Sequence, residues 1–370
     1  MDQGRENQAF FAVMSSDDLW KELKKHMYPG KKTGNWYTWN GDGDTAAHYG
    51  YVSMMKKRDE LVYTSTSICD AAERGCADTV KFLYGISNSS LSSVIELAAT
   101  EGHLEIVKWA HTRNRERKTG AMDYAACNGH LEVVKFLHEN GDTGCSTKAM
   151  DYAAANGHAE VVVWLHENRK EGCTTWAMDC AAAIGCLDLI IWLHNNRTEG
   201  CTEFAMRWAA WGGHLDVVEW LYKNRGERVD GFVEENSVKG CNLHLVKWVH
   251  QHIGGVCSGD VIDAAASRGN LEIVKFLHKN KTGGCSSKAM DLASRNGHLE
   301  VVKWLHENRT EGCTPNAICG AARNGHLEVV KWLHENKRSE CTLMAIYYAY
   351  WSGKIEVMKW LEENAETLGD

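Results

Sequence analysis

One seven-residue string, Gly-His-Leu-Glu-Val-Val-Lys or a close variant of it, returns at a nearly fixed interval along most of this 370-residue chain. The interval is 27 residues twice and then 28 residues from Gly129 to Gly353. Cys241 takes the place of the glycine in one degenerate copy, and Gly50 marks an irregular first copy. The regular glycines are Gly75, Gly102, Gly129, Gly157, Gly185, Gly213, Gly269, Gly297, Gly325 and Gly353. This repetition predicts an array of about 11–12 structural units rather than several independent domains.

Each unit is predicted to contain two helices joined by a tight turn. The first helix follows a hydroxyl residue suited to an N-cap, such as Thr174, and has small apolar residues at helical spacing. A glycine such as Gly185 ends it, since glycine accepts the left-handed conformation of a tight turn. The second helix, as in His298 to Asn308, has one broad apolar stripe and a charged solvent face. A short polar loop leads to the next unit.

A helix pair of this size cannot bury its apolar face alone, so each unit must pack on its neighbours in a one-dimensional stack. The alanines of the first helices allow close approach between units. The predicted fold is therefore an all-α helix-turn-helix solenoid with short loops. We expect the array to occupy residues 41–370, with residues 1–40 as an N-terminal segment that caps its first unit.

The string Ala-Ala-Arg-Asn-Gly-His-Leu-Glu-Val-Val-Lys, at 321–331, resembles the centre of the ankyrin repeat, and the resemblance covers about residues 41–362. The usual Thr-Pro-Leu-His opening is replaced by x-Ala-Met-Asp, as at 148–151, and each unit is about five residues shorter than the family's 33. The resemblance implies a non-enzymatic scaffold that binds another protein, with the first helices lining its concave side. Short-loop arrays of this kind are similar to those of large DNA viruses and protists, which implies host–virus interaction in a host cytoplasm.

Several chemically active residue types recur once per unit, and their spacing argues for structure rather than chemistry. Neighbouring units stack about 8–10 Å apart, whereas a disulfide needs Cα atoms within about 7 Å and a metal needs ligands within about 2 Å. We therefore predict reduced cysteines in a reducing compartment, no metal site, and histidines that cap helices or bind loops. A Trp or Phe in every second helix is predicted to stack the units, and a recurring Asp to meet a helix dipole. The cysteine ladder is Cys145, Cys173, Cys201, Cys257, Cys285, Cys313 and Cys341.

Composition and motifs exclude other functions. The net charge of −8 does not favour nucleic-acid binding, which needs a basic face. No apolar run approaches the roughly 20 residues that cross a bilayer, and Met1 to Ser16 lacks a secretory signal pattern. The chain contains no phosphate-binding glycine loop, nucleophile elbow or His-Glu-x-x-His motif. We expect no enzyme activity, no cofactor, no small-molecule substrate and no membrane partner.

Three positions of the first helix vary freely between units, namely the residue before Ala-Met, the one after Asp and the one after Ala-Ala. Their i, i+4, i+7 spacing puts them on one face. Aromatic residues and arginine, the types enriched at binding hot spots, gather there in the middle units. The alternative interpretation is that these rings fill gaps between helices. The candidate partner-binding residues are Tyr124, Tyr152, Trp176, Phe204, Arg207, Trp208 and Trp211.

Two irregular segments suggest further hypotheses. The unit at 232–259 loses the Ala-Ala pair and places charge inside its first helix, so we hypothesise a weak junction or hinge there. The stretch Asp-Asp-Leu-Trp-Lys-Glu-Leu, at 17–23, resembles the later half of an F-box, whose Leu-Pro part is missing here. Two functions remain open: a protein-binding scaffold, or a substrate adaptor of a ubiquitin ligase that docks through residues 1–40.

Overall fold

The computed structural model describes residues 43–48, 50, 52–56, 62–64, 66–86, 90–114, 119–226, 229–252, 260–280, 285–337 and 342–365. Residues 1–40, the predicted cap with its F-box-like stretch, lie outside these ranges. Every element in them is an α-helix, which confirms the predicted all-α class. The chain divides into two compact units between residues 89 and 90.

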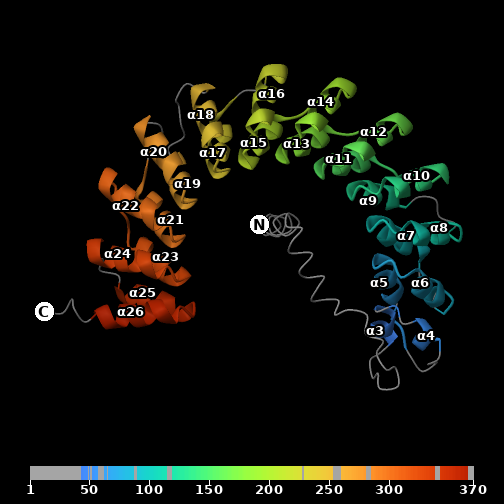
Figure 1. Ribbon diagram of the computed structural model, residues 1–370, viewed down its shortest axis with the longest axis horizontal. Helices are drawn as coiled ribbons and strands as arrows, with labels where there is room; N and C mark the ends of the chain where they lie inside the picture. Colours follow the sequence, from blue (N-terminus) through green and yellow to red (C-terminus); the bar gives the residue numbers. More distant parts are fainter. Residues whose placement is uncertain are drawn as a thin grey trace. The chain divides into compact units, whose positions relative to one another are not determined.

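The helices come in pairs that follow the sequence repeat (Figure 1). In the first compact unit the pairs are α3 (Gly43–His48) with α4 (Val52–Met55), and α5 (Ser67–Glu73) with α6 (Ala77–Tyr84). The first helices of the second compact unit are α7 (Leu91–Thr100), α9 (Ala121–Cys127), α11 (Thr147–Ala155), α13 (Thr175–Ala183), α15 (Glu203–Gly212), α17 (Gly231–Lys239), α19 (Val261–Ser267), α21 (Ser287–Arg295), α23 (Asn316–Asn324) and α25 (Thr342–Trp351). Its second helices are α8 (Leu104–His111), α10 (Leu131–Glu139), α12 (Ala159–Asn168), α14 (Leu187–Asn196), α16 (Leu215–Arg225), α18 (Leu243–His252), α20 (Leu271–Lys279), α22 (Leu299–Asn308), α24 (Leu327–Lys337) and α26 (Ile355–Ala365).

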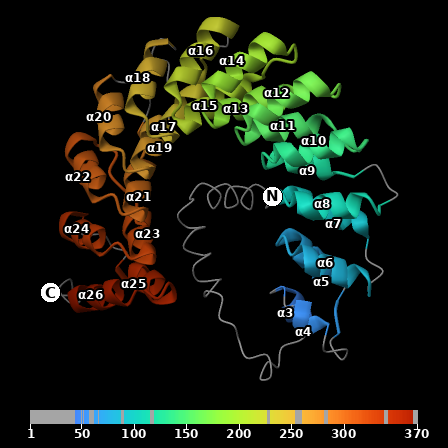
Figure 2. The same cartoon turned by 45° about the vertical axis from the view of Figure 1, so that its right-hand side comes forward.

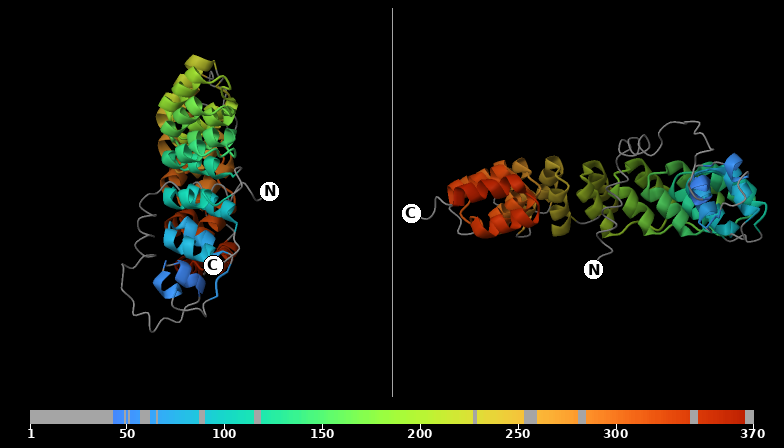
Figure 3. Two further views of the ribbon diagram at one scale, coloured as in Figure 1. Left: turned by 90° about the vertical axis from the view of Figure 1, so that its right-hand side faces the viewer. Right: turned by 90° about the horizontal axis from the view of Figure 1, so that it is seen from below.

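The first helices pack directly on one another because their contact positions are small. Ala181 and Ala182 of α13 are fully buried, as are Ala209 and Ala210 of α15. The second helices bury Val and Leu but place a large ring between units, so they stay further apart. Within residues 90–365 this difference in spacing puts the first helices on the inner side of a curved stack (Figures 1 and 2). The view from below in Figure 3 looks onto these inner helices.

The recurring tryptophans of the second helices are only half-buried, and most of them meet a histidine of the preceding unit edge to face, while Trp248 meets Tyr222 instead. The ring centroids of His278 and Trp304 lie 5.1 Å apart at 86°, and those of His166 and Trp192 lie 5.1 Å apart at 89°. Such aromatic pairs contribute about 0.5–1.5 kcal/mol beyond the area they bury. This geometry agrees with the interpretation that the rings of the second helices stack the units, and it gives the histidines near the ends of these helices, such as His278, a packing role.

At the turns between helices, the glycine of one unit lies under the histidine ring of the next unit. Gly269 has φ +73°, and a Cβ built on it would lie 2.4 Å from Nδ1 of His298. Cys241, the degenerate copy, keeps the positive φ of 57° although it has a side chain, and no other described non-glycine residue does so. The next unit then carries Asn270 instead of histidine, and its Nδ2 donates to the Cys241 carbonyl over 3.3 Å. The smaller amide avoids the clash that a histidine would make with Cys241.

The degenerate unit still forms both helices, but its core is unusual. Glu234 stands where regular units have the Met of Ala-Met, and its side chain is completely buried. Ser237 and Val238 replace the Ala-Ala pair and are also completely buried. A carboxylate in an apolar junction carries a desolvation cost that methionine does not. The hinge hypothesis for this unit stays a prediction.

We predict that Asn270→His lowers the free energy of unfolding by about 1–3 kcal/mol, since the added ring overpacks against the Cys241 side chain. In a Cys241→Gly background the same change should cost little, because the glycine leaves room for the ring. Urea denaturation followed by circular dichroism gives the four values of the cycle. A Cys241→Ala background is the matched control, because it retains the Cβ and should retain the cost. Equal costs of Asn270→His in the glycine and alanine backgrounds would contradict this account.

Candidate partner-binding surface

The candidate residues lie on the inner helices, and several leave much of their ring in solvent. The exposed fractions are 47% for Tyr124, 46% for Trp176, 45% for Phe204 and 48% for Trp211. Tyr152 and Trp208 are half-buried. The variable positions of the sequence therefore do map to an accessible face.

Four rings on three successive units form one aromatic patch, which we define as Trp176 of α13, Phe204 and Trp208 of α15, and Phe232 of α17. Trp208 lies at its centre. Its ring centroid is 5.5 Å from Trp176 in an edge arrangement and 5.3 Å from Phe204 in a stacked one. Phe232, which was missing from the sequence candidates, is the most exposed member at 60%. It was missed because it belongs to the degenerate unit.

Arg207 is tied into the junction between α15 and α17. Its Nη2 donates to Asp230 Oδ2 over 2.8 Å, and its guanidinium carbon lies 4.7 Å from the Phe232 ring centroid and 5.9 Å from that of Phe204. Asp230 also caps α17 by accepting from the Val233 amide over 2.9 Å. Arg207 thus contacts an aspartate of the next unit and two rings of the patch, and its role in binding a partner stays a prediction.

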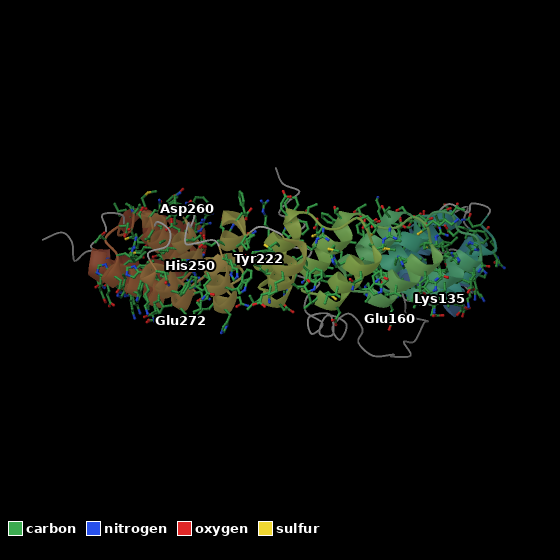
Figure 4. The ribbon with its side chains drawn as sticks, turned by 90° about the horizontal axis from the view of Figure 1, so that it is seen from above. Lys135, Glu160, Tyr222, His250, Asp260 and Glu272 are labelled. Carbon is green, nitrogen blue, oxygen red and sulfur yellow. The ribbon has the colours of Figure 1, made fainter. Side chains whose placement is uncertain are left out.

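The other candidates are not part of this patch. Tyr124 and Tyr152 belong to α9 and α11, and no ring contact joins either of them or Trp211 to the patch within the described ranges. The last unit has its own exposed rings on α25, with Tyr347 at 52% and Trp351 at 70%. On the outer side, where Figure 4 labels it, Tyr222 is 39% exposed, and its ring centroid lies 5.5 Å from that of Trp248.

The recurring aspartates form hydrogen bonds between units, and each carboxylate meets the start of the first helix of the next unit. Asp151 Oδ1 accepts from the Thr174 amide over 2.8 Å, and its Oδ2 accepts from the Thr174 hydroxyl over 2.9 Å. The same hydroxyl oxygen accepts from the Trp176 amide, which begins α13. We call this contact the Asp clamp. It joins Asp123 to Ser146, Asp151 to Thr174, Asp179 to Thr202, Asp263 to Ser286 and Asp291 to Thr314.

The clamp carboxylates are partly desolvated. Burial raises the pKa of Asp151, Asp179 and Asp291, and the hydrogen bonds from the hydroxyl residue only partly offset it. Each group is engaged with helix-capping donors rather than directed at open solvent. The aspartate ladder is therefore a structural device.

The histidines that directly precede the second helices, such as His130 and His298, bond to the preceding unit and do not cap their own helices with their side chains. His130 Nε2 lies 3.0 Å from the Thr100 carbonyl oxygen, and His298 Nε2 lies 3.2 Å from that of Ser267. Burial lowers the pKa of His158 and of His326, and the neighbouring ladder histidine lowers each of them further. No group of three or more His, Cys, Asp or Glu side chains that could hold a metal is found among the described residues.

Three of the ladder cysteines, Cys145, Cys173 and Cys285, are protected thiols. Burial raises the pKa of Cys145 to about 12, and it raises the pKa of both Cys173 and Cys285 to about 11. Because the thiolate is the reactive form, these cysteines are poor nucleophiles. They act as small packing residues just before the starts of α11, α13 and α21.

Comparison with known families identifies the class of protein that this repeat architecture defines. A family model described as ankyrin repeats (3 copies) matches residues 68–151, 95–179 and 292–368. A second model, ankyrin repeats (many copies), matches residues 262–306. Together the matches cover more than half of the chain, which therefore belongs to the ankyrin repeat family. Ankyrin repeats are generally protein–protein interaction modules and typically non-enzymatic.

A search of curated proteins found no match to the chain. Within the described ranges, no helix combines the length and apolar character needed to cross a bilayer.

We predict that mild acid destabilises the array through His158 and His326. Both have folded pKa values below the ordinary 6.5, so the unfolded chain takes up protons first. Their contribution to stability is complete above pH 6.5 and is lost as the pH falls below it. Asparagine is the matched substitution, because Asn242 already occupies this position and donates to the Gly213 carbonyl over 2.8 Å.

The measurement is the melting temperature of the wild type and of a His158→Asn/His326→Asn variant between pH 7.5 and 5.5. The wild type should lose more stability than the variant over this interval. Since both proteins share all the clamp aspartates, the difference isolates the two histidines. Parallel pH profiles would rule out this role.

Proposed function

We propose that this ankyrin chain is a scaffold that binds a partner protein on the inner face of its array, centred on the aromatic patch. The observation that carries the proposal is the exposure of Trp176, Phe204 and Phe232, which is 46%, 45% and 60%. Contiguous exposed apolar surface on a monomer is uncommon and marks interaction sites. Aromatic side chains beside an arginine are the composition typical of binding hot spots.

Gap filling, the alternative role for these rings, accounts for Trp208 but not for its neighbours. Trp208 is half-buried and touches rings on both sides, as a packing residue does. Trp176, Phe204 and Phe232 each keep about half of their surface in solvent. Arg207 holds Phe204 and Phe232 by cation–π contacts, so less side-chain freedom is lost when a partner binds. A preorganised surface of this kind supports binding rather than simple packing.

The proposal extends to the cellular setting and excludes other partner classes. A net charge of −8 argues against a nucleic-acid partner, and the scaffold role requires no cofactor, metal or small-molecule substrate. The protected ladder thiols suit a reducing compartment such as the cytoplasm. The resemblance to short-loop viral arrays supports host–virus interaction as part of the same proposal.

The second candidate function is a substrate adaptor of a ubiquitin ligase. It rests on the F-box-like stretch at 17–23, which lies outside the described residues. In this version the inner face would select the target, and residues 1–40 would dock onto the ligase. The two functions share the binding surface and differ only in what the N-terminal segment contacts.

A Trp176→Ala/Phe204→Ala/Phe232→Ala variant should bind its partner at least about tenfold more weakly, because hot-spot rings cost about 2 kcal/mol or more when truncated. Partners are captured from a cell lysate with the full chain and identified by mass spectrometry, and affinity is then measured by calorimetry. Circular dichroism checks that the variant is folded.

The matched control is Tyr347→Ala/Tyr350→Ala/Trp351→Ala, which removes three rings of the last unit that are 52%, 66% and 70% exposed, and which should retain the partner. Ligase subunits captured equally by wild type and both variants would favour the adaptor function. If the partner binds the folded Trp176→Ala/Phe204→Ala/Phe232→Ala variant (the patch variant) with wild-type affinity, the aromatic patch is not the binding site.

A further inference from the structure

Beyond the aromatic patch, the inner face opens into a hollow of about 1000 Å³, bordered by α17, α19, α21 and α23. It exists because small residues occupy positions where α15 carries tryptophan. Ala264 and Ser267 of α19 correspond to Trp208 and Trp211, and Gly320 of α23 again corresponds to Trp208. The Arg295 side chain lies over Gly320, and a Cβ built on Gly320 would lie 3.0 Å from the Cβ of Arg295.

The hollow carries an excess of unpaired positive charge. Arg268, Lys288 and Arg295 line it, all are exposed, and none of them forms an ion pair within the described ranges. Arg323, on the neighbouring helix α23, is also exposed and forms no ion pair among the described residues. Asp260 is the one exposed acidic residue on the lining.

The two other acidic groups of the lining are already neutralised or engaged. Glu235 is paired with Lys239 at 2.7 Å. Asp263 is buried and holds the amide and hydroxyl of Ser286 as an Asp clamp. The free charges in the hollow are therefore predominantly cationic.

The outer face of the same units is arranged in the opposite way. Lys275, Lys303 and Lys331 each pair with the glutamate three residues earlier, at 3.0, 3.0 and 2.9 Å. These three outer lysines are thus paired within the chain, whereas Arg268, Lys288 and Arg295 of the inner face form no ion pair among the described residues. An unpaired cluster in a concavity attracts anions, because the field is focused there.

We propose that this hollow binds an acidic peptide segment of the partner protein, whose carboxylates pair with Arg268, Lys288, Arg295 and Arg323. This inference rests on the proposed function, since it names the chemistry of the partner that the inner face holds. Helix α17 contributes Phe232 to the aromatic patch and Lys239 to the hollow, so the two surfaces adjoin. A partner that spans both would carry apolar residues next to its acidic stretch.

A peptide fits these observations better than a polynucleotide. The cations are confined to four side chains, whereas the chain as a whole carries −8 and would repel a long polyanion. The outer faces of the same units expose Glu272, Glu300 and Glu328. Asp260, inside the hollow, offers an acceptor for the backbone amides of a peptide, whereas a sugar–phosphate backbone has no N–H donor to pair with it.

The test uses the full chain with a displayed library of random twelve-residue peptides. The charge variant is Arg268→Glu/Arg295→Glu/Arg323→Glu. The matched control, Lys275→Glu/Lys303→Glu/Lys331→Glu, makes the same charge change on the outer helices of nearby units. Selected peptides are then labelled with fluorescein, and their affinities are measured by anisotropy beside an oligothymidine of similar length. Circular dichroism confirms that both variants are folded.

We expect peptides selected on the wild type to be enriched in Asp and Glu, and to bind the charge variant at least about tenfold more weakly while binding the control within about threefold. A selection without acidic enrichment, including one that yields no binders, overturns the proposal. So does oligothymidine that binds more tightly than the peptides. Non-acidic peptides lost only on the patch variant would leave the proposed function standing, whereas acidic peptides lost only on the charge variant would support the hollow without the patch.

Discussion

The array depends on the Asp clamp, in which the carboxylate of one unit binds the residue that caps the first helix of the next unit. The carboxylate binds both the amide and the hydroxyl of a Ser or Thr, and that hydroxyl caps the helix by accepting from the amide two residues on. The hydroxyl residue caps the first helix of its own unit, and the carboxylate of the preceding unit holds that hydroxyl in place, so the order of the cap depends on the neighbouring unit. This is the nearest-neighbour coupling expected of a solenoid. It also fixes the register between units, because the two partners are always 23 residues apart.

The clamp leads directly to the binding surface. The clamp hydroxyls of Thr174 and Thr202 accept hydrogen bonds from the amides of Trp176 and Phe204. These two residues are members of the aromatic patch. At the next junction the chain keeps the 23-residue spacing but reverses the polarity. Arg207 stands where the aspartate would be, and it pairs with Asp230 where the hydroxyl residue would be. The reversal supplies a guanidinium to hold Phe204 and Phe232 in place.

The repeat interval, the two helices of each unit and the exposure of the variable positions could all be predicted from the sequence, because they follow from local spacing. The partners of Asp151 and His298 could not, since they come from neighbouring units, and the distance between units depends on packing that periodicity does not specify. The burial of Glu234 and the exposure of Phe232 were missed for a related reason. Both lie in the degenerate unit, which lacks the Ala-Ala pair that marks the buried and exposed positions of the regular units. The hollow was missed because small residues such as Ala264 look uninformative until their neighbours are known.

The most direct test of this account is amide hydrogen exchange in an Asp179→Ala variant, beside an Asp188→Ala control on the exposed surface of α14. The account predicts faster exchange at the Thr202 and Phe204 amides and a loss of about 1–3 kcal/mol in the free energy of unfolding, because a buried capping partner is removed. The control should leave both amides unchanged. If Asp179→Ala exchanges at the wild-type rate and costs no more than Asp188→Ala, the clamp does not hold the units together.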